Sequence, residues 1–372
     1  LILWDYWAED WRARPLNEPG LQSVVDDWTS DDELTVAELR TALDTATVGG
    51  TQPIDLLGLD LGMAASIELD SQLRPYVGVR VGSQAGRAAD GWPFDTILTA
   101  LVANPTMTRD DLGTVIADAY YAAHGNDETQ SAADLLGDYA NLLTAIDNFS
   151  TVLIANGAAE IGAIKTAREA TQGFESSYYY DYATIDLYDF AERVMSGVSS
   201  AIIDSAAQAV MDAVGPALVR EASGPTYPDA HGISIYFPEI IEDYDTRYDG
   251  AASFLQFTLS TNWDEWVRAY YAYVAALSPA AFGKAAPTHG ASGQPSHITL
   301  SWGASAGATS YEVCWDTNAD DLCQSLWGDV GNVTSYSPAD PLPYDTTHYW
   351  QVRAVNAFGH TYADGGSFWS FP

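Results

Sequence analysis

The run Ile54-Asp55-Leu56-Leu57-Gly58-Leu59-Asp60 decides the fold of this 372-residue chain. It is mostly apolar and follows the turn residues Gly49 and Gly50, so it predicts a buried strand at 54–59. Similar apolar runs predict strands at 1–4 and 77–82. Helical patterns lie between and after these strands, and such alternation is typical of an α/β layered domain.

Helical periodicity recurs over the rest of residues 1–277. The clearest helix start is Thr35, followed three residues later by Glu38, which is the capping-box pattern. A late strand is expected at 233–237. The expected helices span residues 35–43, 63–73, 95–103, 108–121, 131–154, 158–170, 187–194, 201–214 and 263–276.

The pattern changes after residue 277. Residues 278–295 are rich in Ala, Gly, Pro and Ser, as linkers are. Short alternating strands follow, at 297–302, 311–315 and 349–355, separated by turn residues at the spacing of a β-sandwich. The sequence therefore predicts an α/β domain at 1–277, a linker at 278–295 and an all-β sandwich at 296–372.

The charge balance limits the partners. The chain has 51 acidic and 15 basic residues, a formal net charge of −36, which repels nucleic acid and anionic membranes. Cationic proteins, neutral molecules or divalent metal ions are the expected partners. No apolar run reaches the roughly 20 residues that span a bilayer.

Two cysteines, Cys314 and Cys323, flank a polar, turn-like segment at a spacing that closes a hairpin. A disulfide between them would contribute roughly 2–4 kcal/mol and would imply an oxidising compartment. The alternative is a pair of free thiols. With the acidic, lysine-poor composition, the disulfide favours a protein that is secreted or held at the cell surface.

Several runs, in order, resemble the clostripain family of cysteine peptidases. They are LILWD at 1–5, IDLLGLD at 54–60, DGWPFDTILTALVANP at 90–105, IDLYDFAE at 185–192 and AHGISIYFP at 230–238. The resemblance implies a caspase-like three-layer α/β fold, bacterial secreted relatives and cleavage after basic residues. It also implies that the first strands and helices of the domain lie upstream of residue 1, so the N-terminal part is expected to be missing here.

The two catalytic positions of the family are changed. Members read Asp-His-Gly after the first of these strands and Asp-Ala-Cys after the second, whereas this chain reads Asp5-Tyr6-Trp7 and Asp60-Leu61-Gly62. Peptide hydrolysis needs a thiolate that attacks the carbonyl carbon and an imidazole that moves the proton. Glycine offers no nucleophile, and a phenol with a pKa near ~10 is a poor base.

Other residues do not replace the lost pair. Residues 1–277 contain no cysteine, and the positions of their two histidines, His124 and His231, do not match that of the family's base. Ser66 falls inside the next expected helix and Ser83 ends the next strand, so neither matches the nucleophile. The sequence therefore predicts a catalytically degenerate domain.

The resemblance also concerns substrate recognition. Asp60 stands two residues before the nucleophile's position, where the family's carboxylate helps to bind a basic side chain. It either retains a vestigial pocket for Arg or Lys, or serves to cap a helix or satisfy buried backbone. The acidic pair that members carry after the next strand reads Gln84-Ala85 here. We therefore expect a pocket that has lost charge.

Two further features keep alternatives open. Trp7 and Trp11 replace a Gly-rich loop and either plug the core or shape a new ligand site. Calcium is a candidate ligand of two acidic clusters, and family members can depend on it. The competing interpretation is a solvated acidic surface, because neither cluster has the spacing of a known calcium loop. The clusters are Asp26, Asp27, Asp31, Asp32 and Glu33, and Asp243, Asp245 and Asp249.

The C-terminal segment resembles a fibronectin type III domain. The runs that carry the resemblance are ITLSW at 298–302, YEVCWDT at 311–317 and YWQVRAVNAFG at 349–359. It implies that Trp302 and Trp350 pack between two sheets. Such modules usually bind or space other domains.

Together these features predict a non-catalytic, extracellular binding or assembly protein built on a clostripain-like fold. The alternatives are an active Arg/Lys-specific endopeptidase and a decoy that binds basic peptides without cutting them. A strand at 1–4 would leave an open sheet edge, which the upstream segment or another subunit must cover. This predicts an oligomer or a filament.

Overall fold

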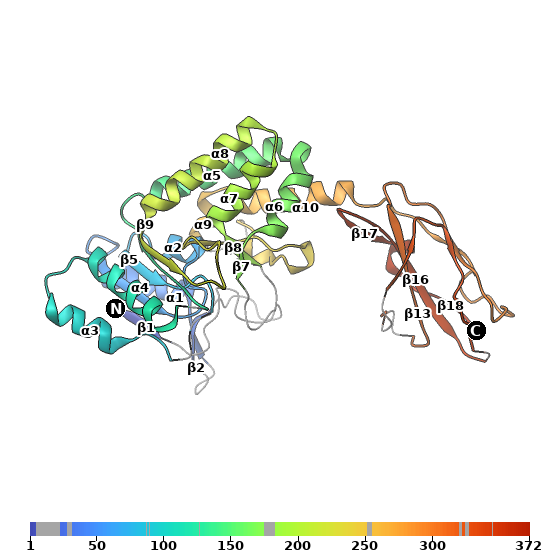
Figure 1. Ribbon diagram of the computed structural model, residues 1–372, viewed down its shortest axis with the longest axis horizontal. Coiled ribbons are helices and arrows are strands. Elements are labelled where there is room, and N and C mark those ends of the chain that lie inside the picture. The colour runs from blue at the N-terminus through green and yellow to red at the C-terminus, as the bar shows by residue number, and fades with distance from the viewer. Residues whose placement is uncertain are drawn as a thin grey trace. The chain divides into compact units, whose positions relative to one another are not determined.

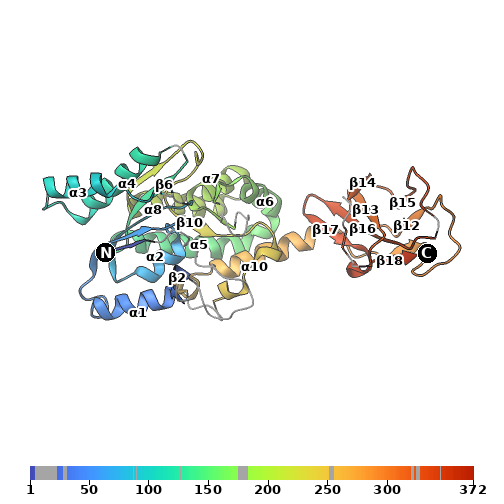
Figure 2. The same ribbon diagram turned by 90° about the horizontal axis from the view of Figure 1, so that it is seen from below.

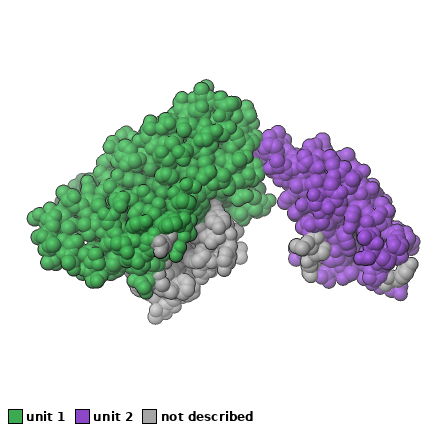
Figure 3. All heavy atoms as spheres, viewed as in Figure 1, with its two compact units in different colours: residues 1–271 green, residues 272–372 purple. Residues whose placement is uncertain are grey.

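The computed structural model describes residues 1–4, 23–27, 32–86, 88, 90–125, 127–174, 183–250, 255–319, 322–323, 327–343 and 345–372. The chain forms two compact units, Leu1–Tyr271 and Ala272–Pro372, which Figure 3 colours separately. Each unit has a hydrophobic core of its own.

A five-stranded sheet forms the centre of the first unit, in the order β1-β4-β5-β6-β9. The strands β1 (Ile2–Trp4), β4 (Ile54–Asp60) and β5 (Val77–Gly82) run parallel. The strands β6 (Thr129–Asp134) and β9 (Leu218–Ser223) are antiparallel to their neighbours. β5 is buried along its whole length, as expected of a central strand with both faces covered.

Helices cover both faces of this sheet. In Figure 2, α3 (Phe94–Ala103) and α4 (Arg109–His124) lie on one side, and α1 (Val36–Ala46) and α2 (Ile67–Leu73) on the other. On the α3/α4 side, one apolar core joins strands and helices. Its members include Leu56, Val79, Val81, Trp92, Ile97, Ile116 and Tyr120. The unit is therefore a three-layer α/β arrangement.

A second group of helices, labelled in Figure 1, completes the unit. It comprises α5 (Tyr139–Asn156), α6 (Ile161–Ala170), α7 (Leu187–Gly197), α8 (Ala201–Ala217), α9 (Gln256–Ser260) and α10 (Trp263–Leu277), the last of which runs on into the second unit. A small antiparallel sheet joins β7 (Gly173–Phe174), β8 (Thr184–Asp186) and β10 (Ser234–Tyr236). Buried rings meet at edge-to-face angles around Phe237, against Phe190, Trp263 and Tyr270. Such aromatic contacts add to the stabilisation from burial alone.

A short antiparallel hairpin, β2 (Ser23–Asp27) with β3 (Asp32–Thr35), leads into α1. The capping box expected at this helix is confirmed. Thr35 Oγ1 accepts a hydrogen bond from the Glu38 backbone N–H at 3.1 Å, and Glu38 Oε2 accepts one from the Thr35 backbone N–H at 3.0 Å. The pair satisfies two backbone donors that a helix start leaves without partners.

Two expected helices needed correction. Residues 131–154 do not form one helix, because 131–134 belong to strand β6 and α5 begins only at Tyr139. The helix expected at 63–73 begins at Ile67, because Ser66 has an extended backbone and caps it. Strand β9 was not expected at all. At β6 and β9, the pairing with neighbouring strands determines the strand conformation, although the local sequence has little strand character of its own.

The second unit contains two antiparallel sheets. One joins β11 (Lys284–Ala286), β12 (Leu300–Trp302) and β15 (Ser335–Tyr336). The other joins β13 (Ser310–Asp316), β14 (Gly328–Gly331), β16 (His348–Asn356), β17 (Gly359–Tyr362) and β18 (Trp369–Phe371). Trp302 and Trp350 are both buried in one core, as expected. Residues 278–295, expected to be a linker, contain strand β11.

Cys314 and Cys323 form a disulfide, with Cα atoms 6.1 Å apart. This confirms the expected pair, and both cysteines of the chain are used by it. The bridge closes the segment that follows β13, and its sequence separation is 9 residues. In the described part of the chain, no helix is long and apolar enough to cross a membrane.

Candidate active-site position

Gly62 is buried in the turn that joins β4 to α2. The next residue, Met63, has a φ of 52° and donates its backbone N–H to the carbonyl oxygen of Ala85 at 2.7 Å. Ala65 likewise donates to the carbonyl oxygen of Ser83 at 2.8 Å. The turn after β4 is therefore bonded to the segment after β5. Tyr6, Trp7 and Trp11 lie outside the described residues.

Apolar side chains fill the space beside this turn. Met63, Ala85, Phe174 and Ala230 form a buried cluster, and Tyr227 packs against it. Phe174 and Tyr227 are in ring contact, with centroids 5.7 Å apart. Gly62 brings no side chain of its own. Position 62 therefore supplies no nucleophile, and the residue that follows it belongs to this apolar cluster.

Both serines near the turn have structural hydrogen bonds. Ser66 Oγ accepts from the Leu69 N–H at 3.3 Å as the cap of α2. Ser83 Oγ lies 2.8 Å from Thr129 Oγ1 and accepts from the Ala85 N–H at 3.2 Å. No histidine bonds to either hydroxyl, so neither has the partner that an activated serine needs.

Asp60 is completely buried at the end of β4. Its Oδ2 accepts a hydrogen bond from the Trp92 backbone N–H at 3.1 Å. The Trp92 ring covers Gly58 on the same strand, where an added Cβ would lie 2.8 Å from the ring. Asp60 thus ties β4 to the loop before α3. The vestigial basic-residue pocket stays a prediction.

Gln84, a position at which the resemblance predicts an acid, joins a buried polar network. Its Nε2 donates to Asp186 Oδ2 at 2.9 Å, and its Oε1 accepts from the Gly232 N–H at 2.7 Å. Asp186 also accepts from the backbone of Asp189, which it caps, and of His231. An amide fits this position because it donates and accepts at once. A carboxylate would face Asp186 directly.

His231 is held against Asp186. Its Nδ1 lies 3.2 Å from Asp186 Oδ1, and its ring stacks on Tyr188 with centroids 4.3 Å apart. Burial lowers the pKa of His231, but the hydrogen bond and the charge of Asp186 outweigh burial, so the pKa lies above its ordinary value. A histidine with a raised pKa holds its proton more tightly than free imidazole does, so a smaller fraction of the ring is free to accept a proton at a given pH.

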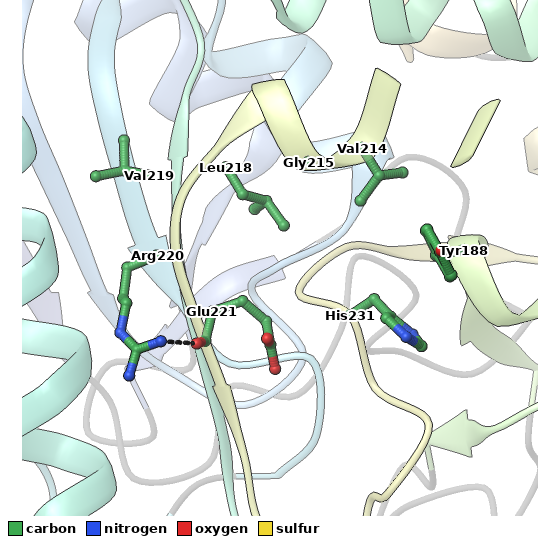
Figure 4. Close-up of a pocket in the computed structure, with 8 residues that line it drawn as sticks. All are labelled: Tyr188, Val214, Gly215, Leu218, Val219, Arg220, Glu221 and His231. Atoms are coloured by element: carbon green, nitrogen blue, oxygen red, sulfur yellow. Dashed lines mark hydrogen bonds between the residues drawn. The ribbon is translucent and has the colours of Figure 1, made fainter. Parts of the chain in front are cut away.

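A shallow pocket of about 320 Å³ adjoins His231 (Figure 4). Its lining residues are Tyr188, Val214, Gly215, Leu218, Val219, Arg220, Glu221 and His231. Burial raises the pKa of Glu221. The Arg220 guanidinium is turned away from this pocket, because it donates hydrogen bonds to the Glu221 carbonyl oxygen and to Asp118. The pocket offers an acid, an imidazole and the phenol of Tyr188, but no serine, threonine or cysteine among its lining residues.

His124 has a structural role at the end of α4. Its Nε2 bonds to the Gly91 carbonyl oxygen at 2.9 Å, and its ring packs on Tyr120 with centroids 4.8 Å apart. These contacts link α4 to the loop that Asp60 holds. Among the described residues, no acidic side chain is bonded to this histidine.

Metal ligands do not converge in the described residues, where no group of three or more His, Cys, Asp and Glu side chains is placed to hold an ion. Asp245 pairs with Arg247, and Asp249 accepts from the Tyr244 hydroxyl at 2.7 Å and pairs with Arg268. The side chains of the other acidic run, at 26–33, lie outside the described residues. Calcium binding stays a prediction.

Glu68 and Asp186 are among the buried acids that were not predicted from the sequence. Glu68 Oε1 accepts from the Tyr236 N–H at 2.9 Å and from the Tyr248 hydroxyl at 2.7 Å. Burial raises the pKa of Glu68 to about 7, against the lowering effect of these hydrogen bonds. Asp186 is the second of these acids. Its place before an apolar helical run is the cap signal that points to it.

Comparison with known proteins gives a family match over residues 1–270, to the model described as the Clostripain family. Among solved structures, a B. fragilis cysteine protease is 17% identical, covers 64% of this chain and 98% of its own, and has a TM-score of 0.44. A secreted C11 cysteine protease from Bacteroides thetaiotaomicron, bound to an irreversible peptide inhibitor, is 15% identical, with coverages of 71% and 72% and a TM-score of 0.47. The structure of FN3tt mut covers 25% of this chain and 91% of its own at 20% identity, with a TM-score of 0.17. No curated protein matches the chain.

Proposed function

We propose, from the premise that this chain belongs to the clostripain family, that it uses the family's fold for extracellular binding or assembly without hydrolysing peptides. The observation that carries the proposal is Gly62. It is buried at the position that the resemblance assigns to the family's nucleophile, and the next residue, Met63, belongs to the apolar cluster with Ala85, Phe174 and Ala230. A buried glycine next to hydrocarbon cannot attack a carbonyl carbon.

The network around Gln84 supports the same proposal. Gln84 and Asp186 are both buried and satisfy one another and the backbone of Gly232. The residues that replace the family's acidic pair thus contribute to stability rather than to a charged pocket. The loss of base, nucleophile and acidic pair together is what a fold released from catalysis would accumulate.

The location and the partners follow from chemistry elsewhere in the chain. The Cys314–Cys323 disulfide supports a secreted or surface-held protein, because such bonds persist in oxidising compartments. The net charge of −36 favours cationic partners. We propose that the second unit is a fibronectin type III module, which would bind a partner or separate other domains.

Assembly is proposed at the open edge of β1. Within the described residues, β1 pairs with β4 alone and ends the sheet. Leu1 and Ile2 are 59% and 40% exposed there. An unpaired strand edge flanked by apolar side chains is a template for another strand. A second copy of the chain or a segment of another subunit would supply it.

The test is peptide hydrolysis by the purified chain. We expect no turnover of fluorogenic arginyl or lysyl substrates, with or without calcium, while an active clostripain-family peptidase assayed in parallel cleaves them. Turnover that co-purifies with the chain and is lost in Asp60→Ala would overturn the proposal in favour of an active peptidase.

A second measurement separates binding modes. A fluorescent Arg-rich peptide is titrated with the chain, and its anisotropy is followed at low and high salt. Saturable binding without cleavage supports the binding function, and its loss in Asp60→Asn, with folding unchanged, would identify the decoy that uses the vestigial pocket. Binding that depends on salt but not on Asp60 would instead assign it to the acidic surface.

A further inference from the structure

Lys284, in β11, is a buried cation in the second unit. It is one of two lysines in the chain, and its side chain is 0% exposed. Its Nζ lies 2.8 Å from Gln351 Oε1, 2.8 Å from the Ser367 carbonyl oxygen and 3.1 Å from Asp364 Oδ2. Lysine is rarely buried in this way, because removing its charge from water is costly.

Aromatic rings enclose the amine. The centroids of Trp350 and Trp369 lie 5.8 Å and 5.4 Å from Lys284 Nζ, and the two rings meet edge to face. Burial lowers the pKa of the Lys284 ammonium, against the hydrogen bond and the charge of Asp364, which raise it. The surroundings therefore favour the neutral, nucleophilic amine more than water does.

Gln351 is fixed beside this amine. It is fully buried on β16, and its Nε2 donates to the carbonyl oxygens of Ala363 at 3.2 Å and Ser367 at 2.9 Å. Its Oε1 accepts from the Val352 N–H at 2.8 Å as well as from Lys284. A backbone donor on a carbonyl oxygen stabilises the negative charge that develops when the carbon is attacked.

Asp364 is the base within reach. Its backbone has a φ of 51°, and its Oδ2 accepts from the Lys284 backbone N–H at 3.1 Å. Gly283 makes room for it, since an added Cβ there would lie 2.8 Å from Asp364 Oδ1. The Asp364 side chain is 28% exposed, so it can exchange protons with water. Amine, amide and carboxylate thus meet in one place.

We propose that Lys284 and Gln351 react to form an intramolecular isopeptide bond between β11 and β16. Asp364 takes a proton from the Lys284 ammonium, and the neutral Nζ attacks Cδ of Gln351. The carbonyl electron pair moves to Oε1 and returns as the C–Nε2 bond breaks. Nε2 leaves with the proton that Asp364 carried, and it also takes the proton that Nζ sheds.

The step is balanced without any further reactant. One ammonium and one primary amide give one secondary amide and one ammonium ion, with no change of oxidation state. The new bond would join a strand of one sheet to a strand of the other. It would therefore hold the two sheets together independently of the Cys314–Cys323 disulfide.

The test is the intact mass of the purified full chain, denatured and reduced. We expect it to be lighter than the sequence mass by one ammonia. Digestion should release a peptide pair that contains Lys284 and Gln351 and survives reduction. Amine labelling of the denatured chain should then modify one lysine, Lys165, and not two.

Two variants assign the roles. Lys284→Arg keeps a cation and its donors but cannot form this amide, so it should have its full sequence mass. Asp364→Asn keeps amine and amide but removes the base, so most of the protein should have full mass and two reactive lysines. Because the bond can form only in the folded second unit, each variant is first shown to be folded by its circular dichroism and cooperative urea unfolding, and is then denatured for the mass measurement.

Three outcomes overturn the proposal. One is a wild-type chain of full mass in which both lysines are labelled. Another is loss of one water with a bond mapped to Asp364, which would make the aspartate the acyl partner. The third is ammonia loss that persists in Lys284→Arg, which would place the reaction elsewhere in the chain.

Discussion

Gln84 donates its side-chain amide to the buried carboxylate of Asp186 at 2.9 Å, across 102 residues of sequence. This one bond links the segment after β5 to the start of α7. It also involves residue 84, a position at which the family resemblance predicts an acid. The identity of residue 84 therefore decides between a charged pocket and a satisfied core.

Restoring an acid at this position should destabilise the fold. In Gln84→Glu, two carboxylates would share a buried site, so we expect a loss of about 3 kcal/mol in the free energy of unfolding at pH 8. The loss should shrink as the pH falls and one acid binds a proton. Urea denaturation at pH 5 and pH 8 measures both.

Gln208 offers a matched control for that change. Its Nε2 donates to Asp212 Oδ1 at 2.8 Å, the same chemical pair on the exposed face of α8. Gln208→Glu should cost less than about 0.5 kcal/mol, as exposed like charges on one helix do. Equal costs at the two positions would show that burial of the pair has no role.

A histidine and a cysteine placed at the two predicted catalytic positions should not give peptide hydrolysis. We expect the double variant Tyr6→His and Gly62→Cys to leave arginyl substrates uncleaved, because the new thiol would be buried beside Met63 and Ala85. Iodoacetamide should label Cys at position 62 roughly 100-fold more slowly than an exposed thiol, since labelling then needs local opening.

Gly215→Cys provides the exposed reference. This glycine lies in α8, is exposed, and has no atom within 4 Å of an added Cβ. Both cysteines of the wild-type chain are held in the disulfide, so each variant has a single free thiol. Rapid labelling at position 62 together with turnover would contradict the prediction.

Local sequence predicted most elements of the first unit, for identifiable reasons. Thr35 and Glu38 are three residues apart, and Val77–Gly82 has a valine at every second position, so each signal is complete within a few residues. Strand β6 reads Thr-Gln-Ser-Ala-Ala-Asp, which has little strand character of its own. It is a strand because β5 and β9 pair with it on both sides.

The polar interior was harder to predict, since its partners are distant in sequence. Gln84 meets Asp186 only when β5 and β8 are in place, and Glu68 meets Tyr248 across 180 residues. Neither pairing leaves a periodic or spaced signal. The glycine at position 62 could be read from the sequence, whereas the hydrogen-bond partners of Gln84 required the fold.

Glu68 predicts a pH dependence of stability. Its pKa is raised by burial from an ordinary 4.5 to about 7, so the native state binds a proton that the unfolded state has lost. The free energy of unfolding should therefore fall as the pH rises from about 4.5 to about 7. The contribution of this group is about 3 kcal/mol.

Glu68→Gln should remove that slope. The variant keeps a neutral side chain at every pH, so its stability relative to wild type should rise by about 3 kcal/mol between pH 4.5 and pH 8. Glu242→Gln, at an exposed position, should show no such trend. Parallel pH profiles for wild type and Glu68→Gln would refute the assignment.

The buried pair of Arg80 and Asp70 should dominate the stability of the central sheet. Arg80 Nε and Nη2 each donate to an Asp70 oxygen at 2.7 Å, and Tyr139 donates to the same carboxylate at 2.6 Å. Arg80→Met should cost about 3–5 kcal/mol, because it leaves a buried carboxylate without its cation. Thermal and urea unfolding measure the cost.

An exposed pair serves as its control. Arg220 and Asp118 are 42% and 51% exposed, and Arg220→Met should cost less than about 1 kcal/mol. Adding Asp70→Leu to Arg80→Met should recover part of the loss, since the uncompensated charge is then gone. An Arg80→Met cost as small as that of Arg220→Met would mean that the buried pair is not structurally important.

The edge of β1 provides the sharpest test of assembly. The Leu1 amine donates to the Leu56 carbonyl oxygen at 3.1 Å, and the Leu1 carbonyl oxygen accepts from the Gly58 N–H at 2.8 Å. Groups of alternate residues point to opposite sides of a strand, so the N–H and C=O of Ile2 face the open edge. Ile2→Pro removes that outward donor and leaves the pairing with β4 intact.

In light scattering, we expect the average mass of the wild-type chain to increase with concentration. Ile2→Pro should raise the dissociation constant of the assembly at least tenfold, which corresponds to about 1.4 kcal/mol. Leu3→Pro is the matched control, because the Leu3 N–H faces β4 and its loss should lower stability instead of assembly. A wild-type chain that stays monomeric at high concentration would rule out the edge as an assembly surface. Association that Ile2→Pro leaves unchanged would place the contact on another face.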